Sequence, residues 1–245
     1  IKLALGSSSS SSKESFGSIS LDLISARVAA IEATASGLTW TFAPMVDVGR
    51  DPRWGRVMEG AGEDPYLGTQ IALARMKGFQ GDDLTDENTM MATAKHFAGY
   101  AFSESGRDYN TVDVGTTTLY NIILPPFEAT AKAGIASVMN SFNDLNGIPA
   151  NGDSFLQREL LKEAWGFGGF IISDWGSIRQ MINHGYSKDL KQAAYHAITS
   201  GNDMDMESQA YQNHLKELVE SGEVDIRIVD EAVRRVLRMK FHLGL

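Results

Sequence analysis

The stretch Ile171-Ile-Ser-Asp-Trp-Gly-Ser177 decides the fold class, because an apolar run ends there in a carboxylate and a tryptophan and then passes into a helical pattern. Asp174 and Trp175 are therefore predicted to lie at the carboxyl end of a strand, where α/β folds bind their ligands. A carboxylate beside an indole suits a sugar, since the indole can cover the apolar face of a pyranose ring. The alternative is that Asp174 only caps the following helix.

Strand and helix patterns alternate on both sides of this stretch. Such alternation predicts a parallel sheet. We therefore expect an α/β fold, a TIM-like (β/α)8 barrel that is incomplete or re-engineered at its amino end, with a further strand at residues 2–5. The clearest strand patterns are residues 38–48, 90–97, 135–140, 170–173 and 203–206, and the helical ones are 19–36, 65–79, 116–133, 154–165, 177–184, 190–200, 208–221 and 225–241.

The amino end departs from this pattern. Gly6 is followed by six serines, Ser7 to Ser12, which is typical of a flexible linker. We expect residues 1–17 to be a strand remnant with this linker and residues 18–245 to be the barrel domain. Because the chain begins with Ile1 instead of Met, it is expected to be a processed or truncated product in which the serines replace deleted strands.

Composition narrows the function classes. With 245 residues, 43% apolar and 22% charged, the chain has the composition of a soluble globular protein, and it contains no apolar run long enough to span a membrane. A net charge of −9 without a basic run argues against a nucleic-acid partner. The absence of cysteine excludes disulfides, thiolate metal sites and cysteine nucleophiles.

Polar side chains follow each predicted strand, and parallel strands bring their carboxyl ends to one rim. Lys95 and His96 offer two donors for sugar hydroxyls, although His96 could instead be a core residue and Lys95 could reach solvent. An acidic run at residues 203–207 resembles a metal site, but its alternation fits a strand and no second histidine lies at ligand spacing, so we predict no metal and no cofactor. The strand-end residues are Asp47, Lys95, His96, Asn140, Ser141, Asp174, Asp203 and Asp205.

The loop at residues 49–56 contains three arginines and a tryptophan. Guanidinium groups suit vicinal hydroxyls and carboxylates. We expect at least one of these arginines to pair with a nearby acidic residue and another to bind substrate.

Five motifs together resemble the barrel domain of glycoside hydrolase family 3, in particular its bacterial β-glucosidase group. The resemblance runs in order from residue 38 to residue 245. The motifs are residues 42–56 (FAPMVDVGRDPRWGR), 62–66 (GEDPY), 95–97 (KHF), 143–150 (NDLNGIPA) and 173–175 (SDW).

The resemblance implies a retaining mechanism with Asp174 as the nucleophile. It further implies that Arg56, Lys95, His96 and Arg107 bind the first sugar, that Trp175 lies beside the leaving-group subsite, and that Phe142 stands where many members have a tyrosine. Arg56 and Arg107 are expected to keep Asp174 ionised, because nearby positive charges lower a carboxyl pKa.

Two features of the family are missing from the pattern. An aspartate-containing segment that grips two sugar hydroxyls should precede residue 38, and nothing like it is present. The family's acid/base is usually a glutamate from a second α/β domain, whereas this sequence stops where the barrel normally ends, and residues 98–110 hold no histidine for the Asp-His alternative of one branch.

We therefore expect a retaining, β-glucosidase-like glycosidase acting on an oligosaccharide or aryl β-glycoside, with the acid/base supplied by a second domain. The alternative is a catalytically impaired carbohydrate-binding or scaffold barrel. The expected location is periplasmic or extracellular, with the cytoplasm as the alternative. We expect no nucleic-acid or membrane partner, and a homodimer would cover strand edges left exposed by an incomplete barrel.

Overall fold

The computed structural model describes residues 10–245, with side chains from residue 19. Helix α1 (Ser10–Ala35) already begins within the serine run, so Ser10 to Ser12 are helical where the sequence predicted a linker. The predicted strand at residues 2–5 and the first serines lie outside the described residues.

A parallel sheet forms the centre of the molecule, which confirms the predicted α/β class. Its strands are β1 (Thr93–Phe97), β2 (Ser137–Asn140) and β5 (Phe170–Ile172), in the order β1-β2-β5, with both pairings parallel. Single parallel bridges extend it on both edges, at Trp40 and Met45 beside β1 and at Met204 beside β5. Within residues 10–245 no bridge joins these two outer segments, so this part of the sheet is open.

The outer segments are the predicted strands 38–48 and 203–206, and each makes fewer bridges than a regular strand. On the first, Thr41 N and Val46 N donate to Met91 O and Lys95 O, at 2.9 and 2.8 Å. Between them Thr93 N donates to Ala43 O and Lys95 N to Pro44 O, at 2.8 and 3.3 Å, but Pro44 has no N–H to donate, so the pairing there is irregular. The two segments nevertheless continue the parallel order of the sheet, as the alternation predicted.

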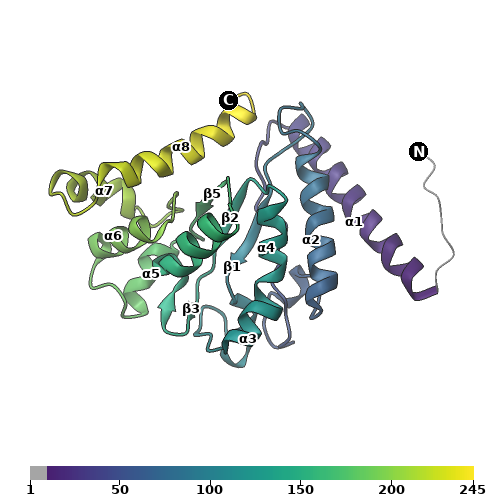
Figure 1. The fold of residues 1–245 in the computed structure, drawn as a ribbon, viewed down its shortest axis with the longest axis horizontal. Coiled ribbons are helices and arrows are strands. Elements are labelled where there is room, and N and C mark those ends of the chain that lie inside the picture. The colour runs from purple at the N-terminus through teal and green to yellow at the C-terminus, as the bar shows by residue number, and fades with distance from the viewer. Residues whose placement is uncertain (1–9) are drawn as a thin grey trace.

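Helices surround the sheet as Figure 1 shows, with α4 next to β1, α2 beside α4, α1 on the outer side of α2, and α8 along the upper left of the view. No helix among the described residues is long and apolar enough to cross a membrane. The predicted helices 116–133 and 154–165 contain π-helical turns at Leu119–Ile123 and Phe155–Ala164, and the hairpin β3 (Asp144–Leu145) with β4 (Ile148–Pro149) was not predicted. The remaining helices are α2 (Pro65–Gln80), α3 (Thr116–Thr118), α4 (Pro125–Lys132), α5 (Ser177–Asn183), α6 (Leu190–Ser200), α7 (Ala210–Glu220) and α8 (Ile226–His242).

Close helix packing fixes α1 against α2. A Cβ atom on Gly78 would lie 2.5 Å from Leu23 O and 2.6 Å from the Ala26 side chain. Only glycine permits this approach of the two backbones, because any side chain would overlap the first helix. α1 is therefore part of the folded domain along the length that contacts α2.

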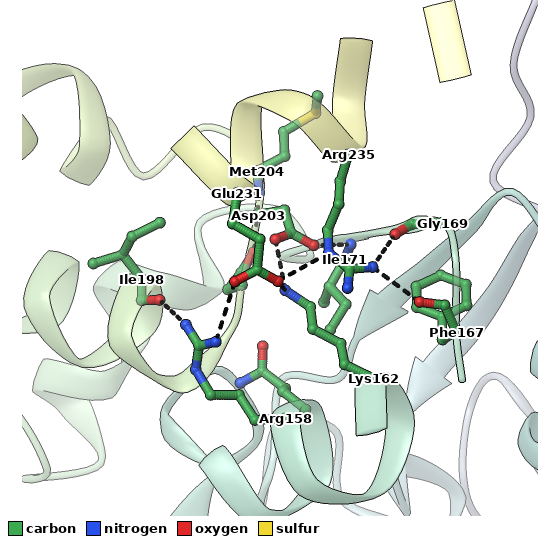
Figure 2. Close-up of polar contacts among 12 residues, drawn as sticks. Arg158, Lys162, Phe167, Gly169, Ile171, Ile198, Asp203, Met204, Glu231 and Arg235 are labelled. Atoms are coloured by element: carbon green, nitrogen blue, oxygen red, sulfur yellow. Dashed lines mark hydrogen bonds and ion pairs between the residues drawn. The ribbon is translucent and has the colours of Figure 1, made fainter. Parts of the chain in front are cut away.

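A buried ion cluster fastens α8 to the sheet. Lys162 Nζ and Asp203 Oδ1 are 2.7 Å apart, with side chains only 5% and 2% exposed. Figure 2 shows Glu231 and Arg235 of α8 reaching down to this pair, and Arg235 donates to the carbonyls of Phe167 and Gly169 just before β5. The cluster thus holds α8, the 155–164 helix and the end of the sheet together.

Candidate functional site

Four predicted residues converge at the carboxyl ends of the strands: Asp47, Lys95, His96 and Asp174. His96 lies between two carboxylates, with Nδ1 2.8 Å from Asp47 Oδ2 and Nε2 3.4 Å from Asp174 Oδ2. Lys95, the neighbouring residue, lies close enough to lower the pKa of Asp174. The parallel sheet creates this meeting, since the three positions are far apart in the sequence.

Asp47 determines the orientation of the His96 ring. Its carboxylate Oδ2 accepts from the backbone N–H of His96 at 2.9 Å and faces Nδ1 at 2.8 Å. An ionised carboxylate only accepts hydrogen bonds, so Nδ1 carries a proton and Nε2 faces Asp174. Nε2 is buried without a hydrogen-bond partner among the described residues. His96 is therefore buried like a core residue. Its Nε2 atom, however, remains free to bind a ligand at the site.

Asp174 does not cap the helix that follows it. Gly176 is the N-cap of α5 and no side chain caps that helix, whereas Asp174 Oδ1 accepts from Trp175 N at 2.6 Å. The capping alternative is therefore wrong. The remaining oxygen, Oδ2, faces His96.

Burial dominates the ionisation of Asp174. Desolvation raises its pKa above the usual value, while His96, the Trp175 N–H, Arg56 and Lys95 each act to lower it. The expected lowering of the pKa by Arg56 is present, Arg107 is not among its causes, and burial outweighs the lowering because the carboxylate loses more hydration than the nearby charges restore.

Glu59 holds the two cations that lie near Asp174. It accepts from Arg56 Nε at 2.6 Å and from Arg56 Nη2 at 3.0 Å, and its Oε2 lies 3.7 Å from Lys95 Nζ. The hydrogen bond to Glu59 is also the main reason that the pKa of Arg56 is raised. The predicted pairing of a loop arginine with a nearby acid is confirmed here and again at Arg53 with Asp51. Sequence reasoning did not identify this bridging role, although the Arg-x-x-Glu spacing was available.

An aromatic cleft adjoins Asp174. Its volume is about 610 Å³, and Tyr109, Phe142 and Trp175 form its aromatic lining. The Trp175 side chain is 67% exposed, and the Tyr109 and Phe142 rings meet edge to face at 4.8 Å. Behind them, Tyr100 stacks edge-on against His96 at 5.1 Å. Tyr100 and Tyr109 were both missed by the sequence analysis, because neither follows a predicted strand.

The structure does not bring every predicted residue into contact with Asp174. Arg107 is exposed, and no ion pair among the described residues joins it to Asp174. Fewer strand ends contribute to the site than the five expected, because several of their polar side chains bond to other parts of the fold. Asn140 bonds Gln157, Ser141 bonds Ala98 O, Asp203 pairs with Lys162, and Asp205 accepts from three N–H groups around the start of α7.

Comparison with known proteins finds relatives over most of the chain. The profile of the glycosyl hydrolase family 3 N-terminal domain matches residues 3–239. A periplasmic β-glucosidase of Salmonella typhimurium is 44% identical over 219 residues, which cover 89% of this chain and 29% of that protein. A β-xylosidase of Formosa agariphila is 37% identical over 87% of this chain and 31% of its own length.

Solved structures include a similar fold. The crystal structure of β-glucosidase from Listeria innocua superposes with a TM-score of 0.91 at 43% identity, over 93% of this chain and 32% of that one. The chain therefore spans about a third of the length of the relatives it matches.

Proposed function

This chain belongs to glycosyl hydrolase family 3, and from that premise we propose that it carries the nucleophile and sugar-binding rim of a retaining, β-glucosidase-like glycosidase. The observation that supports this best is the carboxylate of Asp174 at the end of β5, turned away from the helix cap and toward His96. The named activities of the β-glucosidase and β-xylosidase relatives point to a β-glycoside as the substrate class.

In the proposed reaction, an Asp174 oxygen attacks the anomeric carbon while the bond from that carbon to the leaving-group oxygen breaks. A general acid protonates the departing oxygen. Water then attacks the glycosyl-enzyme ester as the same group removes its proton, which frees the sugar with its original configuration and restores Asp174. Attack requires the ionised carboxylate, so the positive charges of Arg56 and Lys95 favour the reactive form against the effect of burial.

Arg56, Lys95 and His96 are proposed to hold the hydroxyls of the reacting sugar. Glu59 keeps the first two in place, and Asp47 fixes the ring of the third. Preorganised polar groups of this kind stabilise the transition state without moving during the reaction. We assign Arg107 to the same subsite and Trp175 to the leaving-group side; Phe142 lines the wall next to Trp175.

The remaining parts of the proposal concern the acid/base, the barrel and the cellular location. We place the acid/base on a second α/β domain, in keeping with relatives about three times as long as the matched segment. The open sheet is proposed to be part of a TIM-like barrel formed by residues 18–245 and preceded by residues 1–17, of which the last eight begin helix α1. The relative named as periplasmic supports a periplasmic or extracellular location.

Azide rescue tests the role of Asp174. The Asp174→Gly variant should hydrolyse 2,4-dinitrophenyl β-D-glucoside roughly three to six orders of magnitude more slowly than the unchanged protein. Added azide should then enter the vacated space and give α-glucosyl azide, identified by NMR. Asp113→Gly, at an exposed aspartate remote from this geometry, is the control and should keep full activity.

The configuration of the azide product distinguishes a nucleophile role from an acid/base role for Asp174. A β-glucosyl azide product would assign Asp174 to the acid/base role and overturn the proposal. An unchanged protein that binds the glucoside but never releases dinitrophenolate would instead support a carbohydrate-binding barrel without turnover.

A further inference from the structure

The cleft that begins at Trp175, the residue after Asp174, has a feature that the proposed sugar chemistry does not use, namely an arginine in its lining. Arg179 of α5 lines the cleft together with Tyr109, Phe142 and Trp175, and the polar side chains of Gln180 and Asn183 belong to the same lining. No carboxylate lines the cleft. In a chain of net charge −9, this is a local site of positive charge.

The backbone positions Arg179 but does not neutralise it. Arg179 Nη2 donates to Ser208 O at 2.6 Å and lies 3.5 Å from Glu207 O. No ion pair involves Arg179 among the described residues, whereas Arg53, Arg56 and Arg227 each pair with a carboxylate. The rest of its guanidinium fork is thus available to an anionic ligand.

Backbone strain occurs at one residue that lines the cleft and on both sides of the serine that holds Arg179. Tyr109, which presents a half-exposed ring, has a φ of +63°, and Glu207 and Gln209 on either side of Ser208 have φ values of +65° and +58°. Residues with side chains seldom adopt this conformation, and where they do the surrounding structure must enforce it. Here the strained positions are those that present an aromatic ring and the carbonyls holding Arg179.

From these contacts we propose that the cleft binds an aromatic leaving group that carries a carboxylate. The substrate class is then an aryl β-glucoside of a hydroxy-substituted aromatic acid. Its ring lies against Tyr109, Phe142 and Trp175, and its carboxylate accepts hydrogen bonds from Arg179. This assignment rests on the proposed glycosidase function, and it names the leaving group that the site selects.

Binding of the released aromatic acid tests the assignment without requiring turnover. At pH 6.5, 4-hydroxybenzoate should bind about tenfold more tightly than its neutral methyl ester, as measured by calorimetry. In Arg179→Gln, whose amide can still donate to the Ser208 carbonyl, the two ligands should bind equally. The control Arg234→Gln, at an exposed arginine of α8, should keep the preference.

Hydrolysis of the matching glucosides adds a second readout. The glucoside of the acid should show the lower KM, even though the ester has the better leaving group, and Arg179→Gln should remove this advantage. Equal binding of acid and ester by the unchanged protein, or a preference that survives Arg179→Gln, would overturn the assignment. A binding preference without hydrolysis of either glucoside would instead contradict the glycosidase function and leave the anion site standing.

Discussion

Removal of the Asp203 side chain should weaken the fold severely. Asp203 accepts from Lys162 Nζ at 2.7 Å and from Ile171 N at 2.8 Å, and its side chain is 2% exposed. The Asp203→Ala variant leaves a buried ammonium with only Glu231 at 3.7 Å, together with an unpaired N–H on β5. Breaking one side of a buried pair costs about 3–5 kcal/mol. For a domain of this size, that loss lowers Tm by roughly 6–20 °C.

Urea unfolding at pH 7, followed by circular dichroism, measures this change in the free energy of unfolding. The matched control is Glu128→Ala, which removes the acid of an exposed pair with Lys132 one helical turn away. Such pairs contribute about 0.3–0.5 kcal/mol. If Asp203→Ala were no more destabilising than Glu128→Ala, the buried cluster would not be what fastens α8 to the sheet.

Three further predictions concern packing and ionisation. Gly169→Ala should cost about 1–3 kcal/mol in urea unfolding, because its Cβ would lie 2.2 Å from Ala136 O, whereas Gly168→Ala next to it meets nothing within 4 Å and should change little. Asp174→Asn should raise Tm at pH 7, because burial raises the pKa of Asp174 and the folded protein loses stability as the pH rises through that pKa. Melting curves at several pH values should show that this gain in Tm shrinks toward acidic pH. A gain that stays constant with pH would contradict this cause. Lys95→Met removes a charge that lowers the pKa of Asp174, so the acid limb of kcat/KM should move to higher pH, and a limb that stays in place would exclude Lys95 from this role.

The sequence predicted which segments form the parallel sheet better than how regularly the outer segments pair. The pattern of apolar residues reflects which side chains are buried. The predicted bounds of β1, β2, β5, α2, α6 and α8 therefore lie close to the observed ones. The outer segments at Trp40 and Met204 make only single bridges, because strand pairing depends on neighbours that no local pattern contains. The hairpin β3–β4 did carry a local signal, since Asn146 and Gly147 both have positive φ, as the Asn-Gly turn of a tight hairpin requires.

The candidate site was predictable where a strand end determines the direction of a side chain. Asp47, His96 and Asp174 meet because parallel strands end at one edge. Asp203 follows the same pattern yet points into the fold, because Lys162 lies within reach on the neighbouring helix. A sequence motif does not reveal such a partner, and it does not reveal how much hydration a carboxylate loses, which is why the effect of burial on the Asp174 pKa was not predicted.

Trapping of the glycosyl-enzyme is the most direct test of the central claim that Asp174 is a retaining nucleophile. The purified protein is incubated with 2-deoxy-2-fluoro-β-D-glucosyl fluoride, an activated substrate that needs little help from a general acid, and intact mass and peptide mapping are recorded beside Asp174→Asn. The account predicts one added 2-fluoroglucosyl group, located on Asp174 and absent from the variant. A folded protein that gains no mass, or an adduct on another residue, would contradict it.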